Sequence, residues 1–166
     1  MNDLMHQFLF AIFIGIGSTL TFDSWALFLK VVFNITPSNI CLVGRWLRYM
    51  PEGRFKHTNI TSSPGKSGEC IVGWIAHYIF GISFAIIFIL LVGDNWIRNP
   101  KIIPAIIFGV ATVFAPFCIM QPSFGFGLAA SKASNPKQAR IRTLMNHTAF
   151  GIGLYLFALL VNLIRM

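Results

Sequence analysis

Four long apolar segments divide the polar stretches of this chain. They cover about residues 7–30, 70–92, 102–121 and 144–164. A helix rises ~1.5 Å per residue, so some 20 apolar residues match a hydrocarbon core ~30 Å thick. We therefore predict an all-α, polytopic membrane protein with a four-transmembrane-helix bundle. It forms one transmembrane domain over residues 1–166, with loops at 34–69 and 122–143.

The first apolar run is longer than one membrane thickness. From about Leu4 to Phe33, one helix would be roughly 45 Å long, so we expect it to tilt, break or leave the membrane at one end. Gly15, Gly17 and Ser18 are the candidate break points. In the third span, Pro116 lacks an amide hydrogen and predicts a kink.

Small and polar residues recur at every fourth position in the first two spans. The first span carries Gly15, Thr19 and Asp23 in this register, and the second carries Glu69, Gly73, His77, Gly81 and Ala85. Residues four apart share a helix face, and lipid offers no partner to a carboxylate or an imidazole. We expect both faces to point into the bundle, where small residues let helices approach closely.

A short motif occurs twice. The second span contains His77-Tyr-Ile-Phe80-Gly81-Ile82, and the fourth contains His147-Thr-Ala-Phe150-Gly151-Ile152. The first and third spans show no comparable match, which favours convergence on one packing need over an ancient duplication. We predict that the two motif-bearing helices face each other. The glycines expected at helix contacts are Gly15, Gly73, Gly81, Gly109 and Gly151.

The loop at 34–69 predicts one short helix. Thr36-Pro37 has the pattern of an N-cap followed by proline at the first helical position, so we expect a helix to about Met50. Its apolar and basic residues fall on opposite faces, which is typical of a helix in the membrane interface. A helix packed under the bundle in the cytosol remains the alternative. Residues 51–68 are rich in Gly, Ser, Thr and Pro and should be irregular.

Composition and charge define the environment and the orientation. The chain is 55% hydrophobic and 11% charged, which is too little polar material to cover a soluble globule of this size. The net charge of +8 favours anionic lipid headgroups as the partner, and we expect no nucleic-acid binding. The loops at 34–69 and 122–143 hold nine Lys and Arg, whereas the second connection and the C-terminal tail hold three. The positive-inside rule then predicts cytoplasmic loops and periplasmic termini.

The three cysteines show no metal-binding or redox spacing. Cys41, Cys70 and Cys118 form no CxxC pair, and their odd number leaves no complete disulfide set. We expect them to be buried thiols.

Five polar residues make the candidate site. If the predicted orientation holds, they gather toward the cytoplasmic half of the spans: Asp23, Glu69, His77, Gln121 and His147. Intramembrane carboxylates and imidazoles can relay protons or bind a cation, which predicts binding or translocation of a small solute or ion. Two histidines and a carboxylate also form a minimal metal set, which would suit a membrane-embedded metal-dependent enzyme. The structural interpretation is that these residues only fix helix packing. We favour a non-enzymatic role and expect no cofactor or bound metal.

Several motifs carry a family resemblance over nearly the whole chain. They are Gly15-Ile-Gly-Ser-Thr19 with Asp23, Val43-Gly-Arg-Trp46, Gly53-Arg-Phe55 with His57, Gly73-Trp74 with His77-Tyr78, Gln121-Pro122 with Gly125 and Gly127, and His147 with Phe150-Gly-Ile-Gly153. This pattern resembles an uncharacterised family of bacterial four-pass inner-membrane proteins, a domain-of-unknown-function family. The resemblance implies four helices and an inner-membrane location, and it implies no activity, substrate or cofactor.

The resemblance also adds the basic first loop to the candidate site. Its members are Arg45, Arg48, Arg54 and His57, which could lie as a cytoplasmic lid over the mouth of the bundle and hold a phosphate or lipid headgroup. Solvated loop charges are the simpler explanation. Four spans make a thin bundle, so we also expect a homodimer, with Ala105 and Gly109 as candidate contacts.

Overall fold

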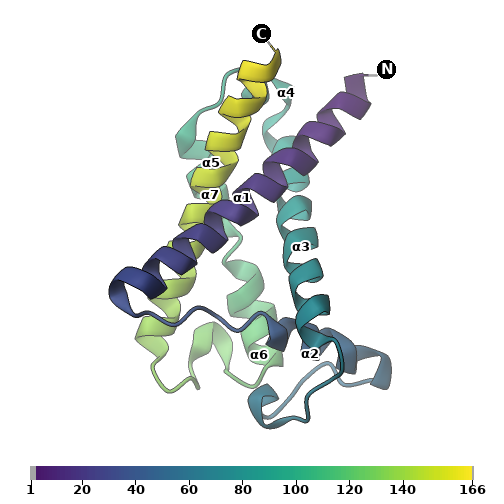
Figure 1. Cartoon of the computed structure of the whole chain (residues 1–166), viewed down its shortest axis with the longest axis vertical. Coiled ribbons are helices and arrows are strands. Elements are labelled where there is room, and N and C mark those ends of the chain that lie inside the picture. Colours follow the sequence, from purple (N-terminus) through teal and green to yellow (C-terminus); the bar gives the residue numbers. More distant parts are fainter. Residues whose placement is uncertain (1–2, 166) are drawn as a thin grey trace. The chain divides into compact units, whose positions relative to one another are not determined.

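The computed structural model describes residues 3–165 and contains no strand within that range (Figure 1). Its long helices are α1 (Asp3–Phe33), α3 (Glu69–Val92), α5 (Ile102–Ala111) and α7 (Pro136–Arg165). The shorter elements are α2 (Cys41–Tyr49), η1 (Met50–Glu52), η2 (Ile60–Ser62), α4 (Asp94–Arg98), η3 (Ala115–Met120), α6 (Gln121–Ser123) and η4 (Leu128–Ala130). The all-α prediction is confirmed.

Four helical segments are long and apolar enough to cross a membrane. They run over Met5–Phe33, Glu69–Val92, Ile102–Ser123 and Pro136–Ile164. The number and order of the predicted spans are therefore confirmed. The fourth helix begins at Pro136, because the Asn135 side chain accepts a hydrogen bond from the Gln138 amide (3.1 Å) and caps its N-terminus.

The chain divides into two compact units. Unit 1 comprises residues 1–37, 78–112 and 146–166, and unit 2 comprises residues 38–77 and 113–145. Both α3 and α7 contribute one part of their length to each unit.

In unit 1, α1 packs on α3 through the face that the sequence predicts. A Cβ atom added to Gly15 would lie 2.6 Å from the Cα of Ile82, and one added to Gly81 would clash with the Thr19 hydroxyl. The hydroxyl of Tyr78 donates to the carboxylate of Asp23 one turn further along (3.2 Å). The i+4 register of α1 is thus a helix-contact face, as expected.

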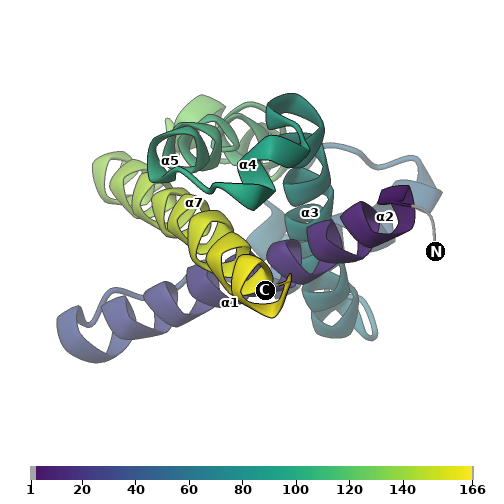
Figure 2. The same cartoon turned by 90° about the horizontal axis from the view of Figure 1, so that it is seen from above.

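The other helix pairs of unit 1 also meet at small residues. Gly153 of α7 packs on Ser18 of α1, and Gly109 of α5 packs on Gly151 of α7. In each case a Cβ atom added to the first glycine would lie 2.6 Å from the Cα of its partner. Figure 2 shows α7 between α1 and α5. The rings of Phe88 and Phe108 bring α3 against α5, with centroids 5.0 Å apart. The four helices of unit 1 therefore form a closed set of contacts.

The first helix does not break at its glycines. It is continuous from Asp3 to Phe33, so the candidate break points Gly15, Gly17 and Ser18 are wrong. The two glycines are contact positions instead, Gly15 against α3 and Gly17 against Phe157 of α7. The Ser18 hydroxyl donates to the Ile14 carbonyl (2.6 Å), which satisfies it within the helix.

The glycines of the repeated motif do not face each other. Gly81 packs on Thr19 of α1, whereas Gly151 packs on Ala105 of α5. Identical motifs thus serve different helix pairs, because the absence of a Cβ permits close approach without choosing the partner. Ala105 is fully buried, and Gly109 contacts α7, so neither supplies the predicted dimer contact within the described structure.

The third span changes its winding near Pro116. The α-helix ends at Ala111, and residues Ala115–Met120 form a π-helical turn with Pro116 near its start. Proline removes one backbone donor, and π-turns absorb such a defect within a helix. The structure thus shows a change of helical winding at Pro116, where the sequence predicts a kink.

Unit 2 joins the first loop to the segment that follows the third span. The His57 amide donates to the Ser123 carbonyl (2.8 Å), and the Ile60 amide donates to the Phe124 carbonyl (3.0 Å). Its apolar core contains Val43, Trp46, Ile60, Ala76 and Phe124. Residues 51–68 lack a long helix, as expected, but their backbone is fixed by these contacts.

The short helix of the first loop begins later than the Thr36-Pro37 pattern predicts. It covers Cys41–Tyr49, because the Asn39 side chain accepts a hydrogen bond from the Cys41 amide (3.0 Å). Its end matches the sequence-based expectation. Its position in the membrane interface stays a prediction.

The contact between α5 and α7 gives a test of the packing. Alanine normally stabilises a helix relative to glycine by about 1 kcal/mol. We expect Gly109→Ala to lower the free energy of unfolding by about 1–3 kcal/mol, because backbone atoms of His147 and Gly151 lie 2.6 Å from the added Cβ. Thermal unfolding in detergent measures the change. Ile107→Ala on the exposed side of α5 is the matched control, and equal melting shifts for the two variants would contradict the packing account.

Candidate functional site

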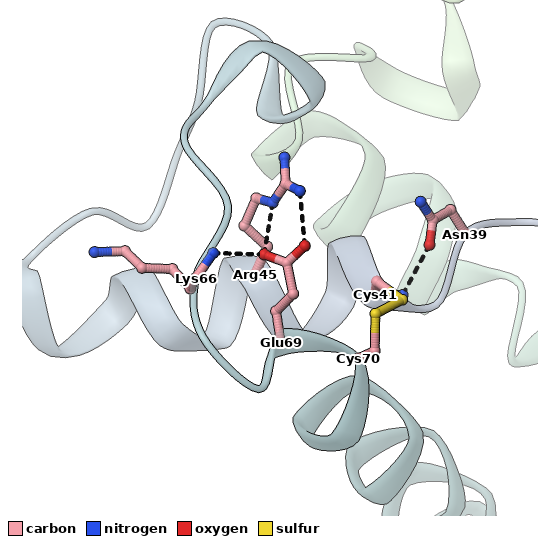
Figure 3. The surroundings of a disulfide bond; sticks show 6 residues. All are labelled: Asn39, Cys41, Arg45, Lys66, Glu69 and Cys70. Atoms are coloured by element: carbon pink, nitrogen blue, oxygen red, sulfur yellow. Dashed lines mark hydrogen bonds and ion pairs between the residues drawn. A yellow bond between two sulfur atoms is a disulfide. The ribbon is translucent and has the colours of Figure 1, made fainter.

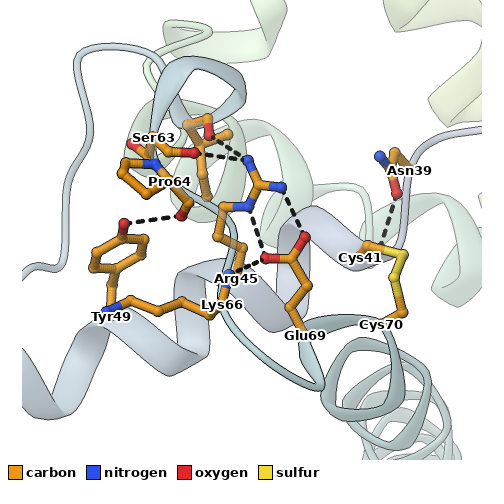
Figure 4. A network of polar contacts seen from close by, with 10 residues as sticks. Asn39, Cys41, Arg45, Tyr49, Ser63, Pro64, Lys66, Glu69 and Cys70 are labelled. Carbon is orange, nitrogen blue, oxygen red and sulfur yellow. Dashed lines mark hydrogen bonds and ion pairs between the residues drawn. A yellow bond between two sulfur atoms is a disulfide. The ribbon is translucent and has the colours of Figure 1, made fainter.

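A bidentate ion pair lies at the centre of unit 2 (Figure 4). Arg45 of α2 donates from Nε to Glu69 Oε2 (2.8 Å) and from Nη2 to Glu69 Oε1 (2.7 Å). Its Nη1 donates to the carbonyls of Ile60 (3.2 Å) and Ser63 (3.0 Å). The two side chains are only 16% and 15% exposed. The bonded carboxylate raises the pKa of Arg45 above its usual value, so the guanidinium stays charged.

The Glu69 carboxylate also fixes the start of α3. Its Oε2 accepts a hydrogen bond from the Lys66 amide (2.7 Å), three residues earlier. A carboxylate at a helix N-terminus satisfies an unpaired amide and is favoured by the helix dipole. Glu69 therefore belongs to the packing of unit 2.

A second group of contacts surrounds Tyr49. Its hydroxyl donates to the Pro64 carbonyl (2.9 Å), and the Lys66 ammonium lies over its ring at 4.3 Å from the centroid. The His57 ring packs edge-on against the same aromatic ring (4.9 Å), with Nδ1 3.0 Å from the Ser63 hydroxyl. Burial lowers the pKa of His57 below its usual value, and the nearby charges of Arg54 and Arg45 lower it further.

A disulfide bond links Cys41 to Cys70 (Figure 3). It joins the first residue of α2 to the second residue of α3, and their Cα atoms are 4.0 Å apart. The expectation of three buried thiols is wrong, because Cys41 and Cys70 form this bond and Cys118 is free and exposed. The helices approach this closely because Gly44 lies against the Glu69 carbonyl and Gly73 against the Ile40 carbonyl.

Among the ionisable side chains in the spans of unit 1, Asp23 and His147 are the two that the sequence places in the candidate site. Asp23 accepts a hydrogen bond from the Tyr78 hydroxyl of α3 (3.2 Å). His147 of α7 contacts Thr112, with Nδ1 2.7 Å from the hydroxyl oxygen. The ring of Phe22 packs edge-on against the His147 ring at 5.6 Å. Phe22, the residue before Asp23, therefore places α1 in contact with the imidazole of His147.

The contacts of Thr112 define the tautomer of His147. The threonine hydroxyl lies 2.6 Å from the Gly109 carbonyl, which can only accept a hydrogen bond. The single hydroxyl hydrogen is used there, so Nδ1 of His147 carries the hydrogen that Thr112 accepts.

The other predicted site residues lie in unit 2. The His77 ring packs edge-on against Trp74 (5.8 Å), and Gln121 has a buried Oε1 with no hydrogen-bond partner among residues 3–165. In the basic loop, Arg48 and Arg54 are exposed, in contrast to the paired Arg45. Asp23 and His147 thus belong to one unit, and Glu69, His77 and Gln121 to the other.

Metal ligands do not gather in the part of the chain that the structure describes. Within those residues, no three His, Cys, Asp or Glu side chains are grouped so that they could hold a metal ion. The minimal metal set suggested by two histidines and a carboxylate therefore receives no support.

Two hydroxyl residues complete the candidate site and were missed from the sequence. Tyr78 follows His77 directly in the sequence, and an intramembrane imidazole is a stronger sequence signal for function than a tyrosine hydroxyl. Thr112 is an uncharged residue in an apolar span. A search for hydroxyls one turn from the contact glycines, Gly81 and Gly109, would have found both.

These features define a four-span membrane protein with polar side chains inside its helical units. The chain belongs to a family described as a protein of unknown function, DUF2938, whose model matches residues 12–161. The family resemblance inferred from the motifs is thereby confirmed. Comparisons with curated proteins and with solved structures return no match.

The ion pair gives a second test. We expect Arg45→Gln and Glu69→Gln each to lower the free energy of unfolding by about 2–3 kcal/mol, because each leaves a largely buried charge without its partner. The double variant should cost less than the sum of the single variants. Thermal unfolding in detergent, with the exposed Arg48→Gln as the control, measures these changes. Strictly additive losses would show that the two side chains are not coupled.

The depressed pKa of His57 gives a prediction about pH. The unfolded chain binds a proton at this imidazole near its ordinary pKa of about 6.5, and the folded chain binds it only at lower pH. The unfolded state therefore holds more protons just below pH 6.5, and stability falls as the pH falls through that window. Melting temperatures between pH 7.5 and 5.5 should drop less in His57→Gln than in the wild type. Parallel profiles would exclude this role for His57.

Proposed function

We propose that the protein binds or translocates a small solute or ion through the polar interior of unit 1. Asp23 is the proposed carrier of the ion or proton, and His147 is a second titratable group in the same unit. Proton-coupled movement is the form of this activity that the side chains suit best. The conclusion rests on one observation, the hydrogen bond between Tyr78 and Asp23 inside two candidate membrane spans.

The cost of burying a carboxylate supports this proposal. An acidic group within a span is expensive unless it is paired or neutralised, so it is normally retained where it is used. Asp23 is half-buried and accepts a hydrogen bond from the Tyr78 hydroxyl. A phenol hydroxyl stabilises a carboxylate by donating to it, and a carboxylate is a group that can bind a proton or a cation.

His147 adds a proton-accepting group on a different helix. An imidazole can both accept and donate a proton, and Nδ1 of His147 already contacts the Thr112 hydroxyl (2.7 Å). The Phe22 ring packs against this imidazole, so a change in its charge would be felt on α1 beside Asp23. Two titratable groups on contacting helices are the minimum that a relay requires.

A structural or assembly role without transport is the second candidate. The hydroxyls of Ser18, Thr19 and Thr21 each bond to a carbonyl four residues earlier in α1. Much of the polar content of unit 1 is thus satisfied locally and contributes to helix packing. A membrane-embedded metal-dependent enzyme has no comparable observation in its favour.

A bacterial inner-membrane location belongs to the same proposal, together with contact to anionic lipid headgroups. The exposed side chains of Arg48 and Arg54 are available for such contacts in unit 2. Homodimerisation remains a proposal, through surfaces other than the buried contact of α5 with α7.

Proton movement across reconstituted vesicles tests the proposal. Vesicles loaded with a pH-sensitive dye receive a potassium gradient and valinomycin, which impose a potential without adding a substrate. We expect wild-type vesicles to acidify faster than protein-free vesicles, and Asp23→Asn to lose at least tenfold of that excess rate. Tyr78→Phe should lose less, because it removes the hydrogen bond and keeps the carboxylate.

Asp94→Asn is the matched control, since Asp94 lies in α4 outside the candidate spans and pairs with Arg98. The same vesicles are then tested with Na⁺ and K⁺ as the permeating ions. No flux of any of the three ions in the wild type would refute translocation. Full flux in Asp23→Asn combined with a lower melting temperature would favour the structural role.

A further inference from the structure

Formation of the disulfide between Cys41 and Cys70 requires an oxidant from outside the protein. Closing the bond removes two electrons and two protons from a pair of thiols, so an oxidant must reach them. Bonds of this kind form and persist in oxidising compartments, whereas cytosolic thiols are kept reduced. The position of the bond therefore carries information about the side of the membrane on which unit 2 lies.

We propose that unit 2 faces the oxidising, extracytoplasmic side of the membrane and that both termini are cytoplasmic. This inference rests on the membrane location within the proposed function, but not on transport. The bond connects α2 in the first loop to the first turn of α3. It thus fixes the compartment of the loop that precedes the second span.

The rest of unit 2 must follow the first loop. Four crossings place residues 34–69 and the connection after the third span on the same side. The backbone hydrogen bonds from His57 to Ser123 and from Ile60 to Phe124 hold these two segments together. One disulfide therefore orients the whole chain, with residues 93–101 on the opposite side.

The number of basic residues favours the opposite orientation. Nine Lys and Arg lie in the two connections of unit 2, and the positive-inside rule would keep them in the cytoplasm. That rule describes a bias on insertion, which other determinants of topology can override. The disulfide is the stronger constraint on orientation, because in a cytoplasmic unit 2 the thiols of Cys41 and Cys70 would be kept reduced.

The exposure of the two cysteines indicates how the bond forms. Cys70 is exposed and Cys41 is half-buried, so Cys70 is the thiol that a protein oxidant reaches first. Its thiolate attacks the oxidant's disulfide, forms a mixed disulfide and expels one oxidant thiolate. Cys41 then attacks the Cys70 sulfur and expels the second. The oxidant gains two electrons, and its two thiolates take up the two protons that the cysteines release.

Packing prepares the pair for this reaction. Gly44 and Gly73 bring α2 and α3 into backbone contact, and the bidentate pair of Arg45 and Glu69 holds the same two helices. The cysteines are therefore adjacent without help from the bond. We expect the disulfide to add stability to unit 2 and not to determine its fold.

Thiol labelling on spheroplasts tests the orientation. In a Cys41→Ser, Cys118→Ala variant, the remaining Cys70 should react with a membrane-impermeant maleimide before lysis. The matched control carries Asn95→Cys, at an exposed position between the second and third spans, with the three native cysteines replaced by Ser or Ala. This control should react only after lysis. The reversed pattern would overturn the proposal.

Two further measurements use the full chain. After acid trapping, the Cys118→Ala protein should resist alkylation until a reductant is added, which shows the bond. A fluorescent protein fused after Met166 should fluoresce, and alkaline phosphatase fused at the same place should be inactive. A free dithiol, or an active phosphatase, would overturn the proposal. Neither result depends on proton flux, so transport and orientation can fail separately.

Discussion

The guanidinium of Arg45 is the group on which the structure of unit 2 depends. Its three nitrogens reach two elements besides its own helix, the first turn of α3 through Glu69 and the loop through the carbonyls of Ile60 and Ser63. Residues 53–68 contain only the short η2 turn, so few backbone amides bond to the carbonyls of this loop, and an arginine supplies several donors in a fixed plane. The loop keeps a defined path because the Arg45 side chain donates to carbonyls that backbone amides would satisfy in a helix. The electrostatic energy of the pair is therefore only part of its contribution.

Unit 1 is held by a different principle. Apolar side chains gain little from leaving lipid for another helix, so contacts depend on close approach and on satisfied polar groups. Glycine removes the side chain at the contacts of α1 with α3 and of α5 with α7. Hydroxyls then bond at short range, as Tyr78 does with Asp23 and Thr112 with His147. The polar groups that suggest an activity thus lie among the same contacts that define the packing. For each substitution there, both activity and stability must be measured to tell the two roles apart.

The spans were predictable because length and hydropathy are local properties of the sequence. The contact face of α1 was predictable too, since Gly15, Thr19 and Asp23 repeat with the period of a helix. The residue that each helix face contacts was not predictable. Glu69 continues the register of Gly81 on α3, but it bonds to Arg45, which is 24 positions away. Nor was the disulfide, because spacing rules concern near neighbours and Cys41 and Cys70 are separated by 29 residues. The start of α2 was also not predictable: Thr36 and Asn39 are both plausible cap residues within one turn of each other, and it is the Asn39 side chain that accepts from the Cys41 amide.

The backbone hydrogen bonds between the first loop and the segment after the third span impose an order of assembly. The amide of Ile60 finds its acceptor on Phe124, which is made roughly 60 residues later. At a synthesis rate of about 5–20 residues per second, the first loop waits roughly 3–12 s before its partner exists. During that interval the third span must be synthesised and inserted. The first loop is therefore translated well before its partner segment and is among the last parts of the chain to reach its final structure.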